Sequence, residues 1–444
     1  MNKLRYACIL LFAVLFYNLA MQSIAPRVFA QPADDIEVLK LQLKQMEGSL
    51  QRQQEQMEYL KKHIESLSLK EDVKQSVKEE VKQEVESYLS SDEARKKMGL
   101  GLPTFTAAYT PDDDKYSFRI STTDSKYSLR LGGRLQFRYT FRDKDEEQDI
   151  STLNIRRARV YAGGNIYGKL LHYYVDLDAD NARNINLRDF YVFWTPAKEL
   201  NAKIGFFKVP SHRQRVATSA KLLLLDRSIS SEFFDQDRDY GLDIYGRPFD
   251  GHMEYHAAIF TGAGENVNTN FDNKLMYVLS VRYNPFGSFD YYGESDITYS
   301  ETLKATMGAS VVFNPKLRDK PSEKAGTAGA FDFGLRYKGI AWENEYYLMS
   351  HDPDGGGSIK SDGFFTQLGY FVLPKKLELA ARYSLLDPDK DRSRDIRREY
   401  TVGLNYYFRG HRSKIQSDFS HLVTDAGIET KHENVFRIQY QIVF

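Results

Sequence analysis

The sequence has one cysteine in 444 residues and, after its first 30 residues, no long apolar run. That cysteine, Cys8, lies at the start of an apolar stretch, residues 7–21, that follows two basic residues. A basic start, an apolar stretch and a small residue at Ala30 are typical of a secretory signal peptide, so we expect residues 1–30 to be removed. A lipoprotein would carry its cysteine at the cleavage point instead. The mature chain then has no thiol, which excludes disulfides and cysteine-ligated metals.

Beyond residue 30, no apolar stretch approaches the roughly 20 residues with which a helix spans a bilayer, which excludes a helical membrane protein. The mean hydropathy is low, -0.52, yet the chain contains 30 Tyr and 28 Phe against 13 Pro. Alternating transmembrane strands with aromatic girdles produce such a composition. The formal net charge is zero. We therefore expect no nucleic-acid partner, and any preference for a charged solute must come from local placement of charge.

Residues 31–100 are predicted to be helical. Apolar residues recur there at alternating spacings of three and four, which is the heptad pattern of a coiled coil. The seam consists of Ile36, Leu39, Leu43, Met46, Leu50, Gln53, Met57, Leu60, Ile64 and Leu67. A second apolar stripe continues to Leu89, and Gly99, Gly101 and Pro103 end the helical region. We expect a periplasmic coiled coil, and the alternative is a single amphipathic helix packed on the rest of the chain.

From residue 101 to 444 the apolar period changes to two, which is the period of a β-strand. The clearest strand covers residues 127–142. Its odd positions are Leu129, Leu131, Gly133, Leu135, Phe137, Tyr139 and Phe141, and its even positions include Arg130, Arg134, Arg138 and Arg142. One face of this strand suits lipid and the other suits water. The four arginines are spaced by ~13 Å along the strand, so they predict a ladder of charge on the water face.

Similar segments recur to the end of the chain, at roughly 21 residues per strand and its connection, which gives about sixteen strands. An even number of antiparallel strands lets the sheet close without an exposed edge. The last strand has an apolar outward face that ends in an aromatic residue, Phe444. The sequence therefore predicts an all-β transmembrane barrel of about 16 antiparallel strands with an N-terminal α-helical coiled-coil segment. A soluble sandwich is the alternative, but its strands would be shorter.

One long interruption, residues 209–240, follows the fifth predicted strand. A loop of this length in a compact barrel is usually functional, so we expect it to fold into the lumen as a constriction loop. Its first part is basic, with Arg213, Arg215 and Arg227, and its last part is acidic, with Asp235 and Asp237.

Short motifs in the barrel portion resemble a family, the phosphate-selective porins of the O and P type. They are LGGRLQ at 131–136, RRA at 156–158, YVDL at 174–177, KIGFF at 203–207, ATS at 217–219, LDR at 225–227 and the closing strand. The resemblance implies a sixteen-stranded trimeric porin in the outer membrane, whose narrowest point is built from lumenal arginines and an inward loop. Where a family member may have lysine just before the ATS motif, this chain has Val216.

Carried over by motif, the resemblance implies that pore residues include Arg134 and Arg157 on the wall, with Arg156 beside Arg157, and Arg227 on the loop. Asp189 resembles the acidic residue that the family has in its fourth strand. Arg130, Arg138, Arg213 and Arg215 complete the predicted anion-binding set. Guanidinium groups suit this purpose because they stay charged and offer paired donors to oxyanions. The alternative interpretation is that these arginines only neutralise loop acids such as Asp235 and Asp237.

An enzyme is not expected, because nine His are scattered without a nucleophile motif, and nucleotide-binding glycine loops and zinc spacings are absent. His252 and His256 could form a metal pair on one strand face, but a solvated role is the more ordinary one without a third ligand. We expect no cofactor and no metal.

We expect passive uptake of small anions, such as phosphate or related oxyanions. A general non-selective porin and an envelope-tethering barrel with a coiled-coil stalk stay open as alternatives. The expected partners are outer-membrane lipid, two further copies of the chain in a homotrimer, and periplasmic or peptidoglycan contacts through the coiled coil.

The heptad seam generates a first testable prediction. Replacing Leu43, Leu50 and Leu60 by polar residues should weaken self-association of the isolated segment 34–89, because these side chains form the buried seam. Analytical ultracentrifugation and circular dichroism over a concentration series measure this. A wild-type segment that stays monomeric and unfolded at high concentration would contradict the coiled coil.

Overall fold

The computed structural model describes residues 105–109, 118–145, 148–180, 184–265, 273–315, 326–351 and 357–444, with scattered residues between 44 and 87. The chain divides into two units, Met1–Leu102 and Pro103–Phe444. In the first unit the described residues, 78–85 among them, are helical. The predicted signal peptide lies outside the described residues, and the association of the seam stays a prediction. No helix among the described residues is long and apolar enough to cross a bilayer.

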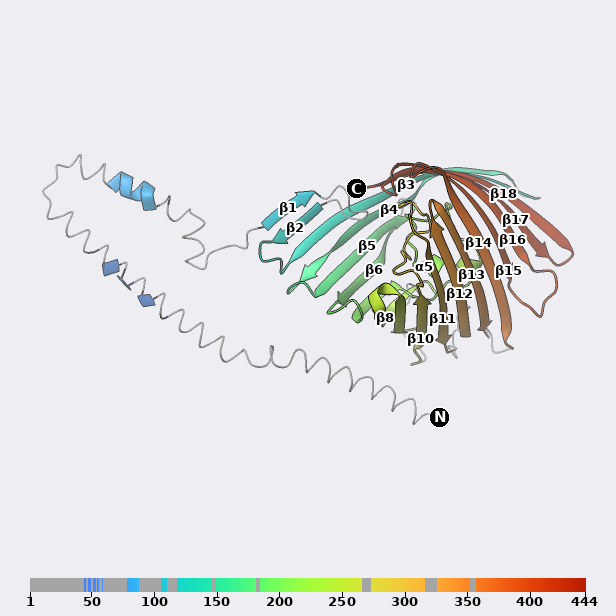
Figure 1. Cartoon of the computed structure of the whole chain (residues 1–444), viewed down its shortest axis with the longest axis horizontal. Coiled ribbons are helices and arrows are strands. Elements are labelled where there is room, and N and C mark those ends of the chain that lie inside the picture. Colours follow the sequence, from blue (N-terminus) through green and yellow to red (C-terminus); the bar gives the residue numbers. More distant parts are fainter. Residues whose placement is uncertain are drawn as a thin grey trace, which may run out of the picture. The chain divides into compact units, whose positions relative to one another are not determined.

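The second unit is a closed barrel of sixteen antiparallel strands, β3 to β18, as the period-two pattern predicts (Figure 1). Each strand pairs with its neighbour in sequence, and β18 pairs with β3 to close the ring. The strands are β3 Ser128–Lys144, β4 Ile150–Ile166, β5 Leu171–Asp180, β6 Asn184–Trp194, β7 Asn201–Lys208, β8 Arg238–Gly246, β9 Met253–Phe260, β10 Met276–Tyr283, β11 Lys304–Asn314, β12 Gly326–Tyr337, β13 Ile340–His351, β14 Ile359–Leu373, β15 Leu377–Asp387, β16 Arg397–Arg409, β17 Ser413–Ala426 and β18 Glu429–Val443.

The alternation of side chains assigns one face of each strand to the lumen. In β10, buried and exposed residues alternate without exception, and the outward positions include Tyr277 and Tyr283. The inward positions elsewhere are mostly polar or charged, for example Gln136 on β3 and Lys414 on β17, both fully buried. The interior is therefore a polar, hydrogen-bonded core, and the apolar surface faces outward, as in barrels that cross membranes.

Two further strands, β1 Phe105–Tyr109 and β2 Phe118–Thr122, form a hairpin that extends the sheet beyond the ring. The hairpin pairs with the first residues of β3, whereas β18 pairs with the later residues of the same strand. The C-terminal residue completes the closure, because the Phe444 amide donates to the Gly133 carbonyl at 2.9 Å and the Gly133 amide donates to the Phe444 carbonyl oxygen at 2.6 Å. The terminal aromatic thus belongs to the seam of the barrel.

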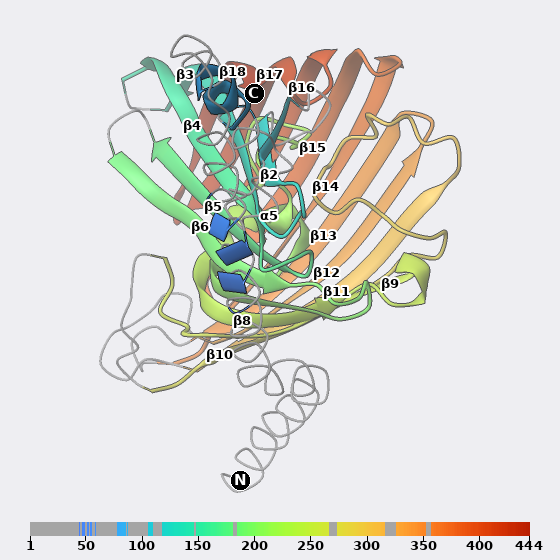
Figure 2. The same ribbon diagram turned by 90° about the vertical axis from the view of Figure 1, so that its left-hand side faces the viewer.

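The connection between β7 and β8, residues 209–237, folds into the lumen (Figure 2). We call it the lumenal loop. It contains two short helices, α5 Arg213–Val216 and α6 Ile229–Phe233. Arg238 already begins β8, so the predicted loop of 209–240 extends three residues too far. α6 reaches the wall opposite β7, because the Ser230 hydroxyl donates to the Leu385 carbonyl of β15 at 2.7 Å.

Candidate functional site

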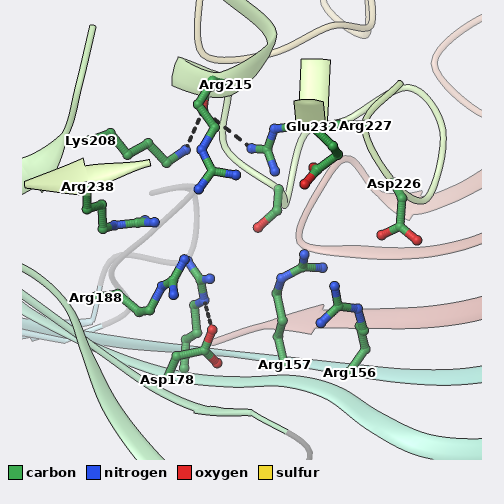
Figure 3. A pocket seen from close by; sticks show the side chains of 12 residues that line it. Arg156, Arg157, Asp178, Arg188, Lys208, Arg215, Asp226, Arg227, Glu232 and Arg238 are labelled. Carbon is green, nitrogen blue, oxygen red and sulfur yellow. Dashed lines mark hydrogen bonds and ion pairs between the residues drawn. The ribbon is translucent and has the colours of Figure 1, made fainter. Parts of the chain in front are cut away.

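A chamber of about 370 Å³ lies between the lumenal loop and the wall formed by β4 to β8 (Figure 3). Eight cationic and three acidic side chains line it, together with Ser219. They are Arg156, Arg157, Arg159, Arg188, Lys208, Arg215, Arg227 and Arg238, and Asp178, Asp226 and Glu232. In Figure 3, Arg156, Arg157 and Asp178 lie on one side of the space, opposite the loop residues Arg215, Arg227 and Glu232. We call this space the cationic chamber.

Two β-bulges explain how so many arginines reach it. Gln136 pairs with Arg157 while Phe137 pairs with Ile155, so Arg156 is an extra residue in β4. In the same way Asp176 pairs with Asp189 while Leu177 pairs with Leu187, so Arg188 is extra in β6. A bulge shifts the alternation and re-aims a side chain. Strict alternation would put Arg156 and Arg188 on the lipid face, and the bulges place both in the lining of the chamber.

Four of the eight cations form ion pairs. Arg159 donates to Asp178 at 2.8 Å, Arg238 to Asp189 at 3.1 Å and Arg188 to Glu265 at 2.6 Å. Arg215 pairs with both Asp235 and Asp237 of the loop. These carboxylates compensate the positive charge of their partners and fix their orientation.

The other four cations form no ion pair with a carboxylate among the described residues. Arg157 donates to the Gln136 side-chain oxygen at 3.1 Å. Lys208 donates to the carbonyls of Arg215 and Ala217 at 2.8 and 3.1 Å, and Arg227 donates to those of Gln214 and Ala217 at 2.9 and 2.8 Å. These carbonyls end α5, where cations are favourable partners. Arg156 is the fourth cation of this group. Arg157, Lys208 and Arg227 thus donate to neutral groups, and the lining as a whole carries eight cations against three carboxylates.

Two adjacent loop residues in the lining, Asp226 and Arg227, stay ionised at neutral pH. Burial and the neighbouring Arg215 lower the pKa of Arg227 to about 10. Burial works against ionisation of Asp226, but the guanidinium groups of Arg138 and Arg437 hold its pKa well below the usual range. Arg227 therefore keeps its positive charge and Asp226 its negative charge at physiological pH.

The loop is anchored by charge on the strands that close the barrel and on the far wall. Asp226 accepts from Arg138 of β3 at 2.7 Å and from Arg437 of β18 at 2.8 Å. Arg213 of α5 pairs with Glu343 of β13, and both side chains are buried. Breaking one member of such a buried pair leaves an uncompensated charge, which is strongly destabilising. The loop position is thus fixed at several points.

Apolar contacts add to this anchoring. Leu223 and Leu224 pack against Ala380 of β15. A Cβ added at Gly369 or Gly403 would lie 2.7 Å from Leu223 or 2.5 Å from Leu224. Glycine at these two wall positions therefore makes the room that the leucines occupy.

Of the nine predicted site residues, the chamber is lined by Arg156, Arg157, Arg215 and Arg227. Arg134 does not line it but donates to Ser219, which does, at 3.0 Å. Arg134 is 1% exposed, and its Nε and Nη1 are buried without a hydrogen-bond partner among the described residues. Asp189 pairs with Arg238. Arg138 and Arg213 hold the loop rather than line the chamber.

The predicted arginine ladder on β3 is wrong as a row of open charges. Arg138 is engaged by Asp226 and Arg142 by Glu433 at 2.9 Å. Arg130 is half-buried and lies outside the lining of the chamber. Acidic residues therefore compensate Arg138 and Arg142, whereas Arg134 in the middle of the strand forms no ion pair with the described residues.

Four cationic lining residues were not predicted: Arg159, Arg188, Lys208 and Arg238. Arg159 lies two residues after Arg157 on the same face, so alternation could have found it. Lys208 and Arg238 flank the loop directly. Arg188 had no periodic signal, because its position depends on the bulge.

The histidine pair considered above does not form. His252 lies in the turn after the short helix η1, Phe249–Gly251, with its ring facing the Asn284 carbonyl, whereas His256 on β9 contacts Asp243 at 3.0 Å. Within the described part of the chain, no group of three or more His, Cys, Asp or Glu side chains is arranged to hold a metal.

Comparison with known proteins relates this arrangement to one family. A family model described as phosphate-selective porin O and P matches residues 129–444. An uncharacterized protein of Aquifex aeolicus is 24% identical over 368 residues, covering 72% of this chain and 87% of that protein. An anion-selective porin from Comamonas acidovorans has 14% identity and a TM-score of 0.52, covering 72% of this chain and all of that chain. The outer membrane channel DcaP of Acinetobacter baumannii has 10% identity and a TM-score of 0.52, covering 72% of this chain and 99% of that chain. The structural likenesses share the barrel fold.

The glycine contacts generate a prediction about the loop. Gly403→Val should displace Leu224 and loosen the loop, because overpacking a filled space costs about 1–3 kcal/mol. Single-channel recordings should show larger and noisier conductance than wild type. Gly329→Val is the matched control, since a Cβ there would meet only the Ser310 carbonyl at 3.5 Å. Equal conductance in both variants and wild type would contradict the role assigned to this packing.

Proposed function

The chain belongs to the phosphate-selective porin O and P family, and on that premise we propose that its cationic chamber selects small anions, phosphate or a related oxyanion in particular. The barrel is an outer-membrane porin channel, and proteins of this family and fold are channels rather than enzymes. Uptake through it is passive, since a water-filled barrel needs no cofactor for conduction.

One observation carries the proposal. Arg156, Arg157, Lys208 and Arg227 converge on one chamber and form no ion pair with the described residues, so their charge is available to a solute. Arg227 uses its Nε and Nη2 for loop carbonyls, while its Nη1 makes no hydrogen bond with the described residues. Arginine offers paired donors to oxyanions, whereas lysine acts as a compact charge. The three arginines therefore favour tetrahedral oxyanions over simple halides.

Arg134 supports the same interpretation from the wall. Its buried Nε and Nη1 are unsatisfied within the described residues, and an unsatisfied buried charge is costly unless a solute or water meets it. We infer that an anion leaving the chamber past Ser219 meets Arg134 next. Several modest sites in sequence suit conduction better than one tight site, because the ion must also leave.

A second candidate function is a general porin with a transverse field. The ion pairs of Arg159, Arg188, Arg215 and Arg238 with carboxylates favour it, because they compensate four of the eight lining cations. The two functions differ in ion selectivity. If the remaining four cations are uncompensated in the working channel, it prefers anions, and otherwise it shows no such preference. Val216, where relatives of the type described above may have lysine, removes one charge that phosphate discrimination would use.

The assembly is also part of the proposal. We propose a homotrimer in the outer membrane, with residues 1–30 removed on export and residues 31–100 forming a periplasmic coiled coil. The heptad seam supports this, since it must be buried against partner helices. Such a stalk offers a contact to peptidoglycan or another periplasmic partner. Envelope tethering would then accompany conduction.

The chamber generates a prediction for single substitutions. Arg157→Ala or Arg227→Ala should shift permeability toward cations and raise the half-saturating phosphate concentration about tenfold. The reason is that hydrogen bonds to charged groups contribute about 1.5–3 kcal/mol. Arg157→Lys should keep most of the anion preference and lose phosphate discrimination, because lysine retains the charge but not the paired donors. Reversal potentials and phosphate block of chloride current in planar bilayers measure both.

Arg142→Gln provides the control, because Arg142 is paired with Glu433 and does not line the chamber. It should leave selectivity near the wild-type value. If the double variant Arg157→Ala/Arg227→Ala conducts with unchanged ion selectivity, the general-porin function replaces the one proposed.

A further inference from the structure

A second segment enters the barrel from the end where short turns join the strands. Residues 284–303 connect β10 to β11, and most of their middle part is buried. We call them the turn-side segment. The Thr218 amide of the lumenal loop donates to the Tyr292 carbonyl at 3.1 Å, and the Glu294 amide donates to the Lys221 carbonyl at 3.1 Å. The Glu294 carboxylate accepts from the Leu223 amide at 2.7 Å. The two inward segments therefore hold each other in place.

A second chamber, of about 710 Å³, lies between this segment and the wall. It is lined by Lys198, Asn201, Tyr245, Arg247, Asp250, Gly251, Glu254, His256, Ser288 and Tyr292. Its two cations and two carboxylates balance, in contrast to the excess of positive charge in the first chamber. The Tyr245 ring stacks on that of His256 at 5.5 Å and 9°. Tyr292 is 46% exposed. We call this space the aromatic chamber.

The lumenal wall between the two chambers is also aromatic. Lys203 on β7 lies over the ring of Phe207, which precedes Lys208 of the first chamber, at 4.1 Å. The same ammonium lies over the ring of Tyr245, which lines the second chamber, at 5.3 Å. Asp243 compensates its charge at 3.2 Å. A solute that leaves the cationic chamber along this wall thus meets ring surfaces and a neutralised lysine.

A bare inorganic anion gains little there. The face of an aromatic ring carries a negative quadrupole, which attracts C–H groups and cations rather than anions. The balanced carboxylates and cations give no net attraction either. An organic skeleton gains more, because its C–H face packs on the rings while its hydroxyl groups bond with carboxylate, amide and guanidinium groups. Pockets with apolar walls and a few placed polar groups are typical of organic ligands.

We propose that this channel carries phosphorylated polyhydroxy compounds, with the phosphoryl group received by the cationic chamber and the carbon skeleton by Tyr245, His256 and Tyr292 of the aromatic chamber. The two chambers act as successive sites. This inference rests on the proposed function and adds the class of organic solute to it. Tyr292 is the specificity-determining residue, because the turn-side segment presents its ring to the chamber and the Thr218 contact fixes its backbone.

Block of chloride current in planar bilayers tests this with the full-length protein, glucose 6-phosphate and inorganic phosphate being the two probes. Tyr292→Ala should raise the half-blocking concentration of glucose 6-phosphate roughly threefold to tenfold, the range expected for losing one aromatic contact. Block by inorganic phosphate should not change. Phe286→Ala is the matched control, because Phe286 lies on the same segment, is 51% exposed and does not line the chamber. It should leave both probes unaffected.

The possible outcomes distinguish a failure of the proposed function from a failure of the inference about organic phosphates. A wild-type channel that neither probe blocks, and that prefers cations, overturns the proposed function itself. Block by phosphate together with an unchanged response of Tyr292→Ala to glucose 6-phosphate overturns only the inference about organic phosphates. Only inserted, conducting channels are scored, so a variant that fails to fold gives no current. Tyr292→Leu, which keeps a branched apolar side chain and removes the ring, then takes its place with the same expected shift.

Discussion

The crossing of the lumen by residues 209–237 depends on buried ion pairs that hold the loop to distant strands. Asp226 accepts from Arg138 and Arg437, and Arg213 pairs with Glu343. A sixteen-strand barrel is wide, and a loop inside it must satisfy its own backbone groups. Lys208 and Arg227 meet that need by donating to the carbonyls at the end of α5. The side chains that give the loop its shape are therefore also the ones that charge the chamber.

Selectivity in this account follows from which cations have acidic partners and which do not. Acidic residues compensate Arg159, Arg188, Arg215 and Arg238 and orient them. The other four cations, Arg156, Arg157, Lys208 and Arg227, form no ion pair with the described residues. The two bulges in β4 and β6 add Arg156 and Arg188 to the chamber at no change in strand number. A chain with no net charge thus concentrates positive charge at one point of its lumen.

The period-two pattern was sufficient to predict the barrel and its sixteen strands, because both depend on local alternation of apolar and polar residues. The roles of individual arginines were not predictable in the same way. Arg138 and Arg134 occupy equivalent faces of β3, yet one is paired with Asp226 and the other is not, which depends on where the loop lands. Arg188 enters the chamber because of a bulge, and alternation alone assigns it to lipid. The turn-side segment carries no charge pattern that distinguishes it from an ordinary connection, so its contacts with the lumenal loop were missed.

The central claim is that uncompensated arginine and lysine at the cationic chamber make the open channel prefer anions. The reversal potential of the wild-type, full-length protein in a planar bilayer, under a potassium chloride gradient at neutral pH, tests this most directly. The reversal potential should have the sign of the chloride equilibrium potential, which means that chloride is more permeant than potassium. A potential of the opposite sign, or one near zero in an open and folded channel, would contradict it.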